Sequence, residues 1–201
     1  MRKICLLFLI LLMICPALPA IAGTTSGDYT YELLADGTAS ITGCTASGDI
    51  TIPAKLDGHK VTNLAEQLFF GAGGITSVSI PASVTYFGND AASNVWDYVF
   101  SYCYVLKSIT VDSDNPSFRS VDGVLYTKDK SILINYPAGK EGGSYQVPSS
   151  VEYLACTSFA SCSKLKHLYL EGSDTYWMTY TFYGDPDLQV HYLTGDRKSV
   201  V

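Results

Sequence analysis

The sequence predicts a solenoid that is mostly β with short helical turns, in which coils of about 23 residues stack as a right-handed superhelix. Three observations predict this fold class. A phenylalanine recurs with a fixed apolar pattern behind it, the spacings reduce to one unit length, and each unit ends in apolar-x-apolar, the period of a strand with one buried face. Because 47% of the 201 residues are hydrophobic and no heptad pattern occurs, a disordered chain and a coiled coil are excluded.

Residues 1–22 are expected to be a secretory signal peptide. Arg2 and Lys3 form a positive start, residues 4–15 are an unbroken apolar run, and Ala20-Ile21-Ala22 is a small-x-small cleavage motif. This apolar run is too short to span a bilayer of about 30 Å as a helix. We therefore expect export with cleavage after Ala22 and no membrane span in the mature chain; the alternative is an uncleaved anchor.

Residues 23–49 precede the repeats and carry a hairpin signal. Apolar and polar residues alternate from Tyr29 to Gly43 on both sides of Asp36-Gly37. Asp-Gly is favoured in tight β-turns, so two antiparallel strands are predicted here.

The repeat occupies residues 50–195. Four segments share a Phe that is followed by apolar positions six, nine and eleven residues later, and they start at Phe69, Phe100, Phe159 and Phe182. Upstream of the first three Phe residues we expect a Val-x-x-apolar pair, at Val61/Leu64, Val84/Phe87 and Val151/Leu154; in the last repeat Asp174 and Trp177 occupy these positions. One coil cannot bury its own apolar face, so the four Phe side chains are predicted to form a single buried column.

The spacings locate two interruptions. The step from Phe159 to Phe182 equals one repeat unit, whereas the step from Phe69 to Phe100 is longer by eight, an excess that falls close to residues 89–96. A second and larger excess lies between Phe100 and Phe159, where the repeat pattern vanishes. Within this insertion, residues 112–146, Val124–Tyr126 and Ile132–Tyr136 are predicted to pair as strands around a turn at residues 128–130.

Several repeat units read as Ile/Val-Pro-x-x-Val, then Phe-x-x-Cys, as in the stretches Ile80–Gly88, Val147–Val151, Phe100–Cys103 and Phe159–Cys162. Over residues 28–193 the chain thereby resembles the BspA-like (treponemal class) leucine-rich repeats. The resemblance implies a leucine-rich-repeat solenoid with an N-terminal hairpin cap and a hairpin insertion that projects between repeats. It is weakest in the fourth unit, where Asp185 replaces Cys and His191 replaces an apolar residue.

Cys103 and Cys162 occupy one repeat position, which favours small buried side chains whose thiols bond to turn backbone. A disulfide, a metal pair or a nucleophile is the alternative. Cys44 and Cys156 lie outside this position, and a disulfide that involves them is left open.

No pattern indicates catalysis, a cofactor or a metal. Zinc-ligand spacings, nucleophile elbows and phosphate loops are missing from the sequence. Asp112, Asp114 and Asp122 gather around Asn115, but they lack a complete calcium-loop register and favour a solvated acidic turn. A hydrolase is the least supported hypothesis, and the chain is predicted not to be an enzyme.

Binding is predicted on the concave face of the sheet, at the outward strand positions Ser77, Ser79, Ser108, Thr110, His167 and Tyr169. Surface aromatics are a second candidate, and they crowd the later repeats: Trp96, Tyr98, Tyr102, Tyr104, Tyr153, Tyr169, Tyr176, Trp177, Tyr180, Tyr183 and Tyr192. Trp177 is expected in the core.

The family resemblance implies adhesion to extracellular or host proteins by a bacterial cell-surface or secreted protein. A spacer or accessory domain of a larger surface enzyme or glycan-binding protein is the alternative. A net charge of −6 argues against nucleic acid as a partner. Residues 196–201 resemble a translated sequencing adapter, so we expect a truncated gene with a non-native tail.

Overall fold

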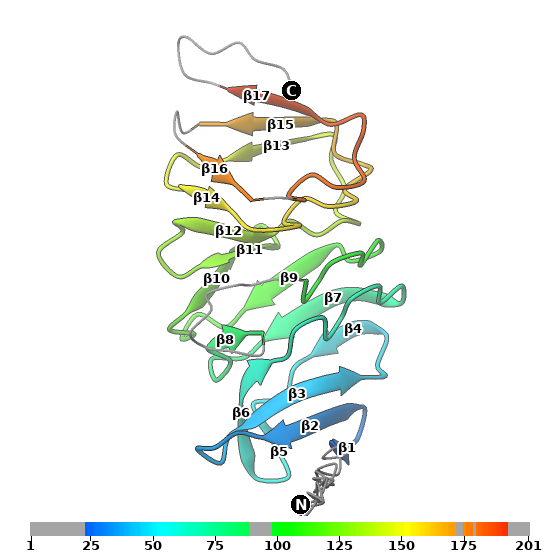
Figure 1. The fold of residues 1–201 in the computed structure, drawn as a ribbon, viewed down its shortest axis with the longest axis vertical. Helices are drawn as coiled ribbons and strands as arrows, with labels where there is room; N and C mark the ends of the chain where they lie inside the picture. Colours follow the sequence, from blue (N-terminus) through cyan, green and yellow to red (C-terminus); the bar gives the residue numbers. More distant parts are fainter. Residues whose placement is uncertain (1–22, 89–97, 172–174, 179, 193–201) are drawn as a thin grey trace, which may run out of the picture.

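The structure is a computed structural model that describes residues 23–88, 98–171, 175–178 and 180–192 (Figure 1). These residues form seventeen strands and no helix. Where short helical turns were expected, the described chain has tight turns, such as the one closed by the Phe70 N–H donating to the Gln67 carbonyl at 2.9 Å. The strands are β1 Thr24–Ser26, β2 Tyr29–Leu33, β3 Ala39–Cys44, β4 Gly48–Thr51, β5 Lys55–Leu56, β6 His59–Leu64, β7 Ile75–Ile80, β8 Tyr86–Phe87, β9 Ser108–Val111, β10 Phe118–Val121, β11 Val124–Thr127, β12 Ile132–Asn135, β13 Ser144–Val147, β14 Tyr153–Leu154, β15 His167–Leu170, β16 Tyr176–Trp177 and β17 Gln189–Tyr192.

Each coil contributes a strand to two parallel ladders that run along the long axis of the molecule (Figure 1). Ladder A contains β3, β6 and β8, and resumes as β12, β14 and β16. Ladder B contains β4, β7 and β9, and resumes as β13, β15 and β17. Both ladders are therefore interrupted in the middle of the molecule. The loop that carries the repeated Phe connects ladder A to ladder B in each coil.

The hairpin predicted around Asp36-Gly37 is confirmed, because β2 and β3 pair antiparallel. The Asp36 carboxylate accepts from the Thr38 N–H at 3.0 Å and holds the turn. The second strand of the hairpin also serves as the first strand of ladder A. Ile41 is the partner of Leu64, which is in turn the partner of Phe87, and each of these steps equals one repeat unit.

The strand register supports the first interruption. Val78 is paired with Ile109, which lies one repeat unit and eight extra positions further along the chain. The extra positions therefore leave the ladder undisturbed. Residues 89–96, close to which this excess was predicted, lie outside the described residues.

The segment in which the repeat pattern vanishes contains a hidden coil. Tyr136 lies one repeat unit before Phe159 and stacks on it, with ring centroids 5.3 Å apart. β13 pairs in parallel with β15, and Tyr145 is the partner of Leu168 at the same interval. The sequence pattern was lost because Tyr replaces Phe and because Gly139 stands at the Cys position. The true insertion is thus shorter, by one full coil, than the sequence pattern indicated.

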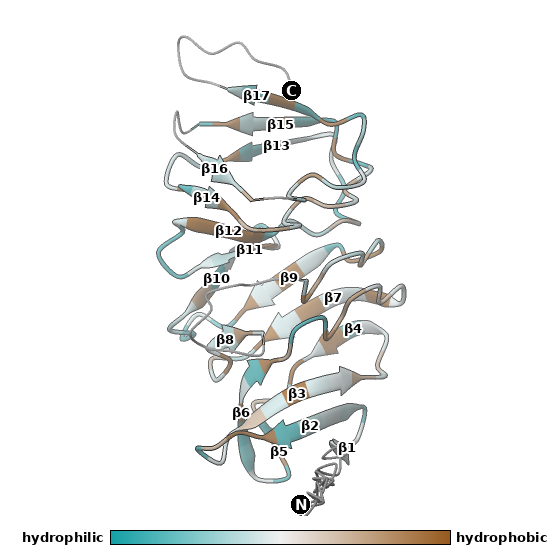
Figure 2. Ribbon diagram, viewed as in Figure 1, coloured by the Kyte–Doolittle hydropathy of each residue, from teal (hydrophilic) through white to brown (hydrophobic). Residues whose placement is uncertain are grey.

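β11 and β12 pair antiparallel as predicted, but the hairpin does not project from the solenoid. Leu125 and Ile134 belong to one hydrophobic core, whereas Val124, Tyr126 and Leu133 belong to a second. All five side chains are at most 3% exposed, and β12 is brown along most of its length in Figure 2. The hairpin is thus an internal wall that is apolar on both faces, as in a sheet buried on both sides.

This wall divides the molecule into two blocks. The N-terminal block, residues 23–121, surrounds the first core, and the C-terminal block, residues 124–192, surrounds the second. Phe69 and Phe100 stack at 5.5 Å in the first block, and Phe159 contacts Phe182 at 6.1 Å in the second. The first three rings are buried, whereas Phe182 is only partly buried. The predicted column therefore consists of two stacks, and Tyr136 begins the second.

The last repeat corrects the sequence alignment. Leu168 is paired with Val190, at a step that is one residue shorter than the repeat unit, so one residue is missing between Leu188 and Val190. A slip of one residue exchanges the two faces of a strand. Val190 therefore faces the core, and His191 lies on the outer face and does not replace an apolar residue.

Candidate binding surfaces

The strand face is the solvent side of ladder B. The six predicted residues Ser77, Ser79, Ser108, Thr110, His167 and Tyr169 all occupy it, at positions that alternate with buried ones. It is not one continuous sheet, because the hairpin wall separates β9 from β13. The first four residues therefore lie on one half and the last two on another.

The N-terminal half of the strand face is rich in hydroxyl groups. The Asp49 carboxylate accepts from the Thr76 hydroxyl at 2.7 Å and the Ser77 hydroxyl at 2.8 Å. These two hydrogen bonds lower the pKa of Asp49, because they favour the ionised form. Ser77 is thus engaged within the sheet, and this half offers short polar side chains rather than a shaped pocket.

The C-terminal half carries rings. His167 and Tyr169 on β15 lie beside His191 on β17. The Tyr169 ring stacks on the His191 ring, with centroids 4.7 Å apart and an interplanar angle of 18°. Nδ1 of His167 and Nε2 of His191 are 3.1 Å apart. Sequence reasoning missed His191 as a surface residue because it assumed a uniform repeat length.

A second surface, the aromatic edge, lies on the Phe loops. Tyr102 contacts Phe70 at a centroid distance of 4.9 Å, Tyr104 at 6.1 Å and Tyr183 at 6.3 Å, and Tyr183 contacts Tyr180 at 5.9 Å. Four of these five side chains are about half exposed, from 47% to 57%, and Tyr102 is partly buried among them. The edge joins rings from both blocks. The sequence analysis included the four tyrosines in a longer set of candidate surface aromatic residues, but it did not include Phe70.

The backbone of the Phe loops repeats a strained feature. Around each of the four Phe residues, the residues two before and two after it have a positive φ, and these are Gln67 and Gly71, Tyr98 and Tyr102, Thr157 and Ser161, and Tyr180 and Gly184. The left-handed region suits glycine and disfavours a bulky side chain. Tyrosine nevertheless occupies three of the eight positions. The side chains at Tyr102 and Tyr180 thus occupy positions that backbone preference alone would assign to glycine.

Cys103 and Cys162 are structural. The Cys103 thiol donates to the Phe69 carbonyl at 2.9 Å, and the Cys162 thiol points to the Tyr136 carbonyl at 3.7 Å, so each links its coil to the coil before it. Burial raises the pKa of Cys103 to about 11 and that of Cys162 well above its usual value. Both therefore stay protonated at neutral pH and are poor nucleophiles and metal ligands. None of the four cysteines in the described residues forms a disulfide.

The acidic cluster around Asn115 has no free amide to offer a cation. The Asn115 amide nitrogen donates to the carbonyls of Pro81 and Val84 at 2.9 and 2.8 Å, and its oxygen accepts from the N–H groups of Ser117 and Phe118. The residue is fully buried. Among the described residues no three His, Cys, Asp or Glu side chains gather as a metal site.

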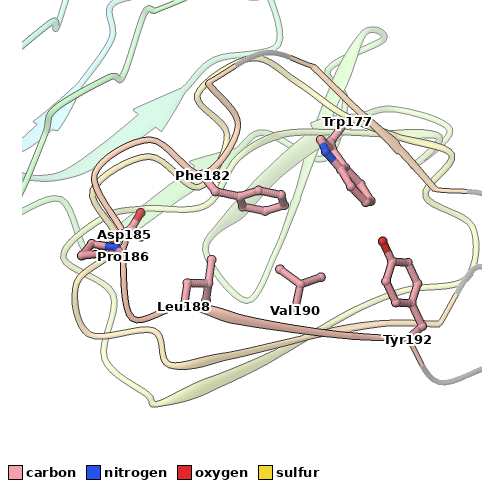
Figure 3. Close-up of a pocket in the computed structure, with 7 residues that line it drawn as sticks. All are labelled: Trp177, Phe182, Asp185, Pro186, Leu188, Val190 and Tyr192. Atoms are coloured by element: carbon pink, nitrogen blue, oxygen red, sulfur yellow. The ribbon is translucent and has the colours of Figure 1, made fainter. Parts of the chain in front are cut away.

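A pocket of about 210 Å³ opens at the C-terminal end of the described solenoid (Figure 3). It is lined by Trp177, Phe182, Asp185, Pro186, Leu188, Val190 and Tyr192. All but Pro186 stand at repeat-core positions, so the pocket is the interior of the last described coil. Trp177 was expected in the core, but it is 41% exposed here because no further described coil covers it.

Comparison with known proteins identifies the repeat. The model of the BspA type leucine rich repeat region matches residues 37–120 and 141–199, in six copies. The pneumococcal vaccine antigen PcpA is similar in structure, with a TM-score of 0.56 and 30% identity over 67% of this chain and 32% of PcpA. A leucine-rich repeat protein from Eubacterium ventriosum has a TM-score of 0.58 and 23% identity over 72% of this chain and 38% of its own.

The chain thus spans about a third of the length of either structure. No curated protein matches it. Within the described residues, no helix has the length and apolar character needed to cross a bilayer.

Proposed function

The chain belongs to the BspA-type leucine-rich-repeat family, and from this membership we propose that it is a non-catalytic module by which an exported bacterial surface protein adheres to an extracellular protein. The repeat fold supports protein binding in general, because stacked coils present extended surfaces. Export rests on the features of residues 1–22, which lie outside the described residues. The observation that carries the proposal is the aromatic edge.

The composition of the edge suits a protein partner. Tyr and Phe cover large contact areas and lose little side-chain entropy on binding, which is why Tyr is enriched among residues that dominate interface energies. Scattered apolar residues on a surface need no explanation, but five rings that are joined by pairwise contacts across two blocks form a patch. The positive φ of Tyr102 and Tyr180 adds a second argument, because glycine would be cheaper there if the side chain did nothing.

This geometry allows a sharp experiment. Replacing Tyr102 or Tyr180 with Gly removes a ring and relaxes a left-handed residue, so stability should stay within about 1 kcal/mol of the parent. Proteins captured from a host-cell surface preparation by the immobilised domain would first be identified, and the affinity of one purified partner would then be measured. We expect Tyr102→Gly to weaken this affinity about tenfold or more, the effect of losing a central interface ring.

A matched control lies on the opposite ladder. Tyr153 and Tyr176 on β14 and β16 stack at 5.6 Å and are as exposed as the edge residues. Tyr153→Ala should leave the affinity unchanged. If His167→Ala or Tyr169→Ala weakens binding and the edge variants do not, the partner lies on the strand face instead. If none of these variants matters, the adhesive role is wrong and the spacer or accessory-domain alternative takes its place.

A further inference from the structure

Two imidazole rings meet on the C-terminal half of the strand face. His167 on β15 and His191 on β17 come from successive coils, and both are partly buried. Their facing nitrogens, Nδ1 of His167 and Nε2 of His191, are 3.1 Å apart. The missing residue before Val190 brings them onto one face, because a coil of the regular length would have turned His191 inward.

The separation of these nitrogens suits two ligands of one metal ion. With metal–nitrogen bonds of about 2.0–2.1 Å, two nitrogens lie about 2.9 Å apart at a right angle and about 3.4 Å apart at the tetrahedral angle. The observed 3.1 Å falls between these limits. Imidazole nitrogen is a preferred ligand of Zn²⁺, Ni²⁺ and Cu²⁺.

The surroundings hold the rings in place and do not repel a cation. The Tyr169 ring stacks on His191 and restricts its orientation, the kind of support that metal-binding histidines need. Among the strand residues of ladder B none is Lys or Arg. The neighbouring Lys166 ammonium lies 3.4 Å from the Asp187 carboxylate, which offsets its charge.

We infer that His167 and His191 form a two-histidine clip for a divalent late transition-metal ion such as Zn²⁺. No third His, Cys, Asp or Glu among the described residues completes the set, so water or a group from a partner would fill the other positions. Gln189 stands beside the clip, because it is the strand partner of His167. An ion held by two protein ligands on an exposed face leaves coordination sites open, and so it can bridge to a carboxylate or imidazole of a second protein.

Calorimetric titration with ZnCl₂ tests this inference, on tag-free protein at neutral pH in a buffer that does not bind metals. One Zn²⁺ per chain should bind the parent. His167→Gln and His191→Gln should each lower the affinity about tenfold or more, since each leaves a single ligand. Gln189→His adds a third imidazole beside the clip and should tighten binding by a similar factor.

His59 provides the matched control. It lies on β6 in the other block, where its Nδ1 contacts the Gly37 carbonyl at 3.0 Å, and His59→Gln should leave Zn²⁺ binding unchanged. Unfolding in EDTA checks that each variant keeps the fold. The inference is overturned if the parent binds no Zn²⁺, or if the clip variants bind it as the parent does. In that case the two rings share only a hydrogen bond.

Discussion

The two blocks on either side of the hairpin wall are built from the same type of coil. They differ in how their terminal coil is covered and in the side chains on their strand face. In the N-terminal block the β2–β3 hairpin extends ladder A and covers the first coil, and the strand face carries hydroxyl groups. In the C-terminal block the last described coil is open, and the strand face carries imidazole and phenol rings. The Cys position varies in both blocks, with Ala72 beside Cys103 in the first and Gly139 and Asp185 beside Cys162 in the second.

The difference teaches which features a coil of this type requires. Ladder pairing survives a step that is one residue shorter than the repeat unit and another that is eight residues longer, and it survives the replacement of Phe by Tyr. The residues between the ladders can therefore vary, provided that an inward apolar residue meets its partner in each strand. Surface chemistry is then free to differ from one block to the other.

The largest expected effect is the loss of stability when a buried ring is removed from the second Phe stack. A partly buried ring in the same stack provides the comparison. Phe159 is fully buried, so Phe159→Ala should lower the free energy of unfolding by about 3–5 kcal/mol. Phe182→Ala should cost about half of that or less, because its ring is only partly buried. Urea denaturation of both variants measures the difference. Equal losses would mean that the last coil is as well covered as the one before it.

A smaller effect is expected where the two blocks meet. A Cβ on Gly139 would lie 2.6 Å from the Val105 carbonyl carbon and 2.8 Å from its oxygen, and backbone cannot move aside as a side chain can. Gly139→Ala should therefore destabilise the fold by about 1–3 kcal/mol, the usual cost of overpacking. Gly143 has open space around the same position and supplies the control. A loss equal to that of Gly143→Ala, measured by urea denaturation, would contradict the close contact.

The smallest expected effect is the pH dependence of stability. A carboxyl in the C-terminal block should lower stability as pH rises, and one in the N-terminal block should raise it. Burial raises the pKa of Asp185 to about 6, despite nearby backbone N–H groups that favour its ionised form. The folded state therefore binds the proton more tightly than the unfolded chain, and stability falls as pH rises from about 4 to about 6. Because the carboxyl is only half buried, the loss should be about 1 kcal/mol or less.

Asp185→Asn should remove this loss, as seen by unfolding at a series of pH values. Asp49 in the N-terminal block has a lowered pKa, and its contribution is present at neutral pH and is lost as pH falls below about 4. Asp49→Asn should accordingly lower stability only above about pH 4, where the Asp49 carboxylate is ionised. If the stability of the two variants depended on pH in the same way, the opposite pKa shifts of Asp185 and Asp49 would be contradicted.

Much of the architecture was readable in the sequence. The Phe recurrence, the strands around Val78, Ile109 and Leu168, and the hairpins at Asp36-Gly37 and at residues 124–135 all follow local periods. The two structural cysteines were also placed correctly, by repeat position alone. The six strand-face residues were assigned to the correct side of their strands. That they bind a partner stays a prediction.

The sequence by itself thus determined the unit, because a two-residue period and a fixed spacing are properties of the chain near each residue. Only the tertiary structure decided which faces are covered. It turned a hairpin into a wall, since both of its faces had a core to meet, and it revealed Tyr136 as the start of a coil. It also placed His191 beside His167, because hydrogen-bonded register, and not spacing from the last Phe, selects the residue that faces inward.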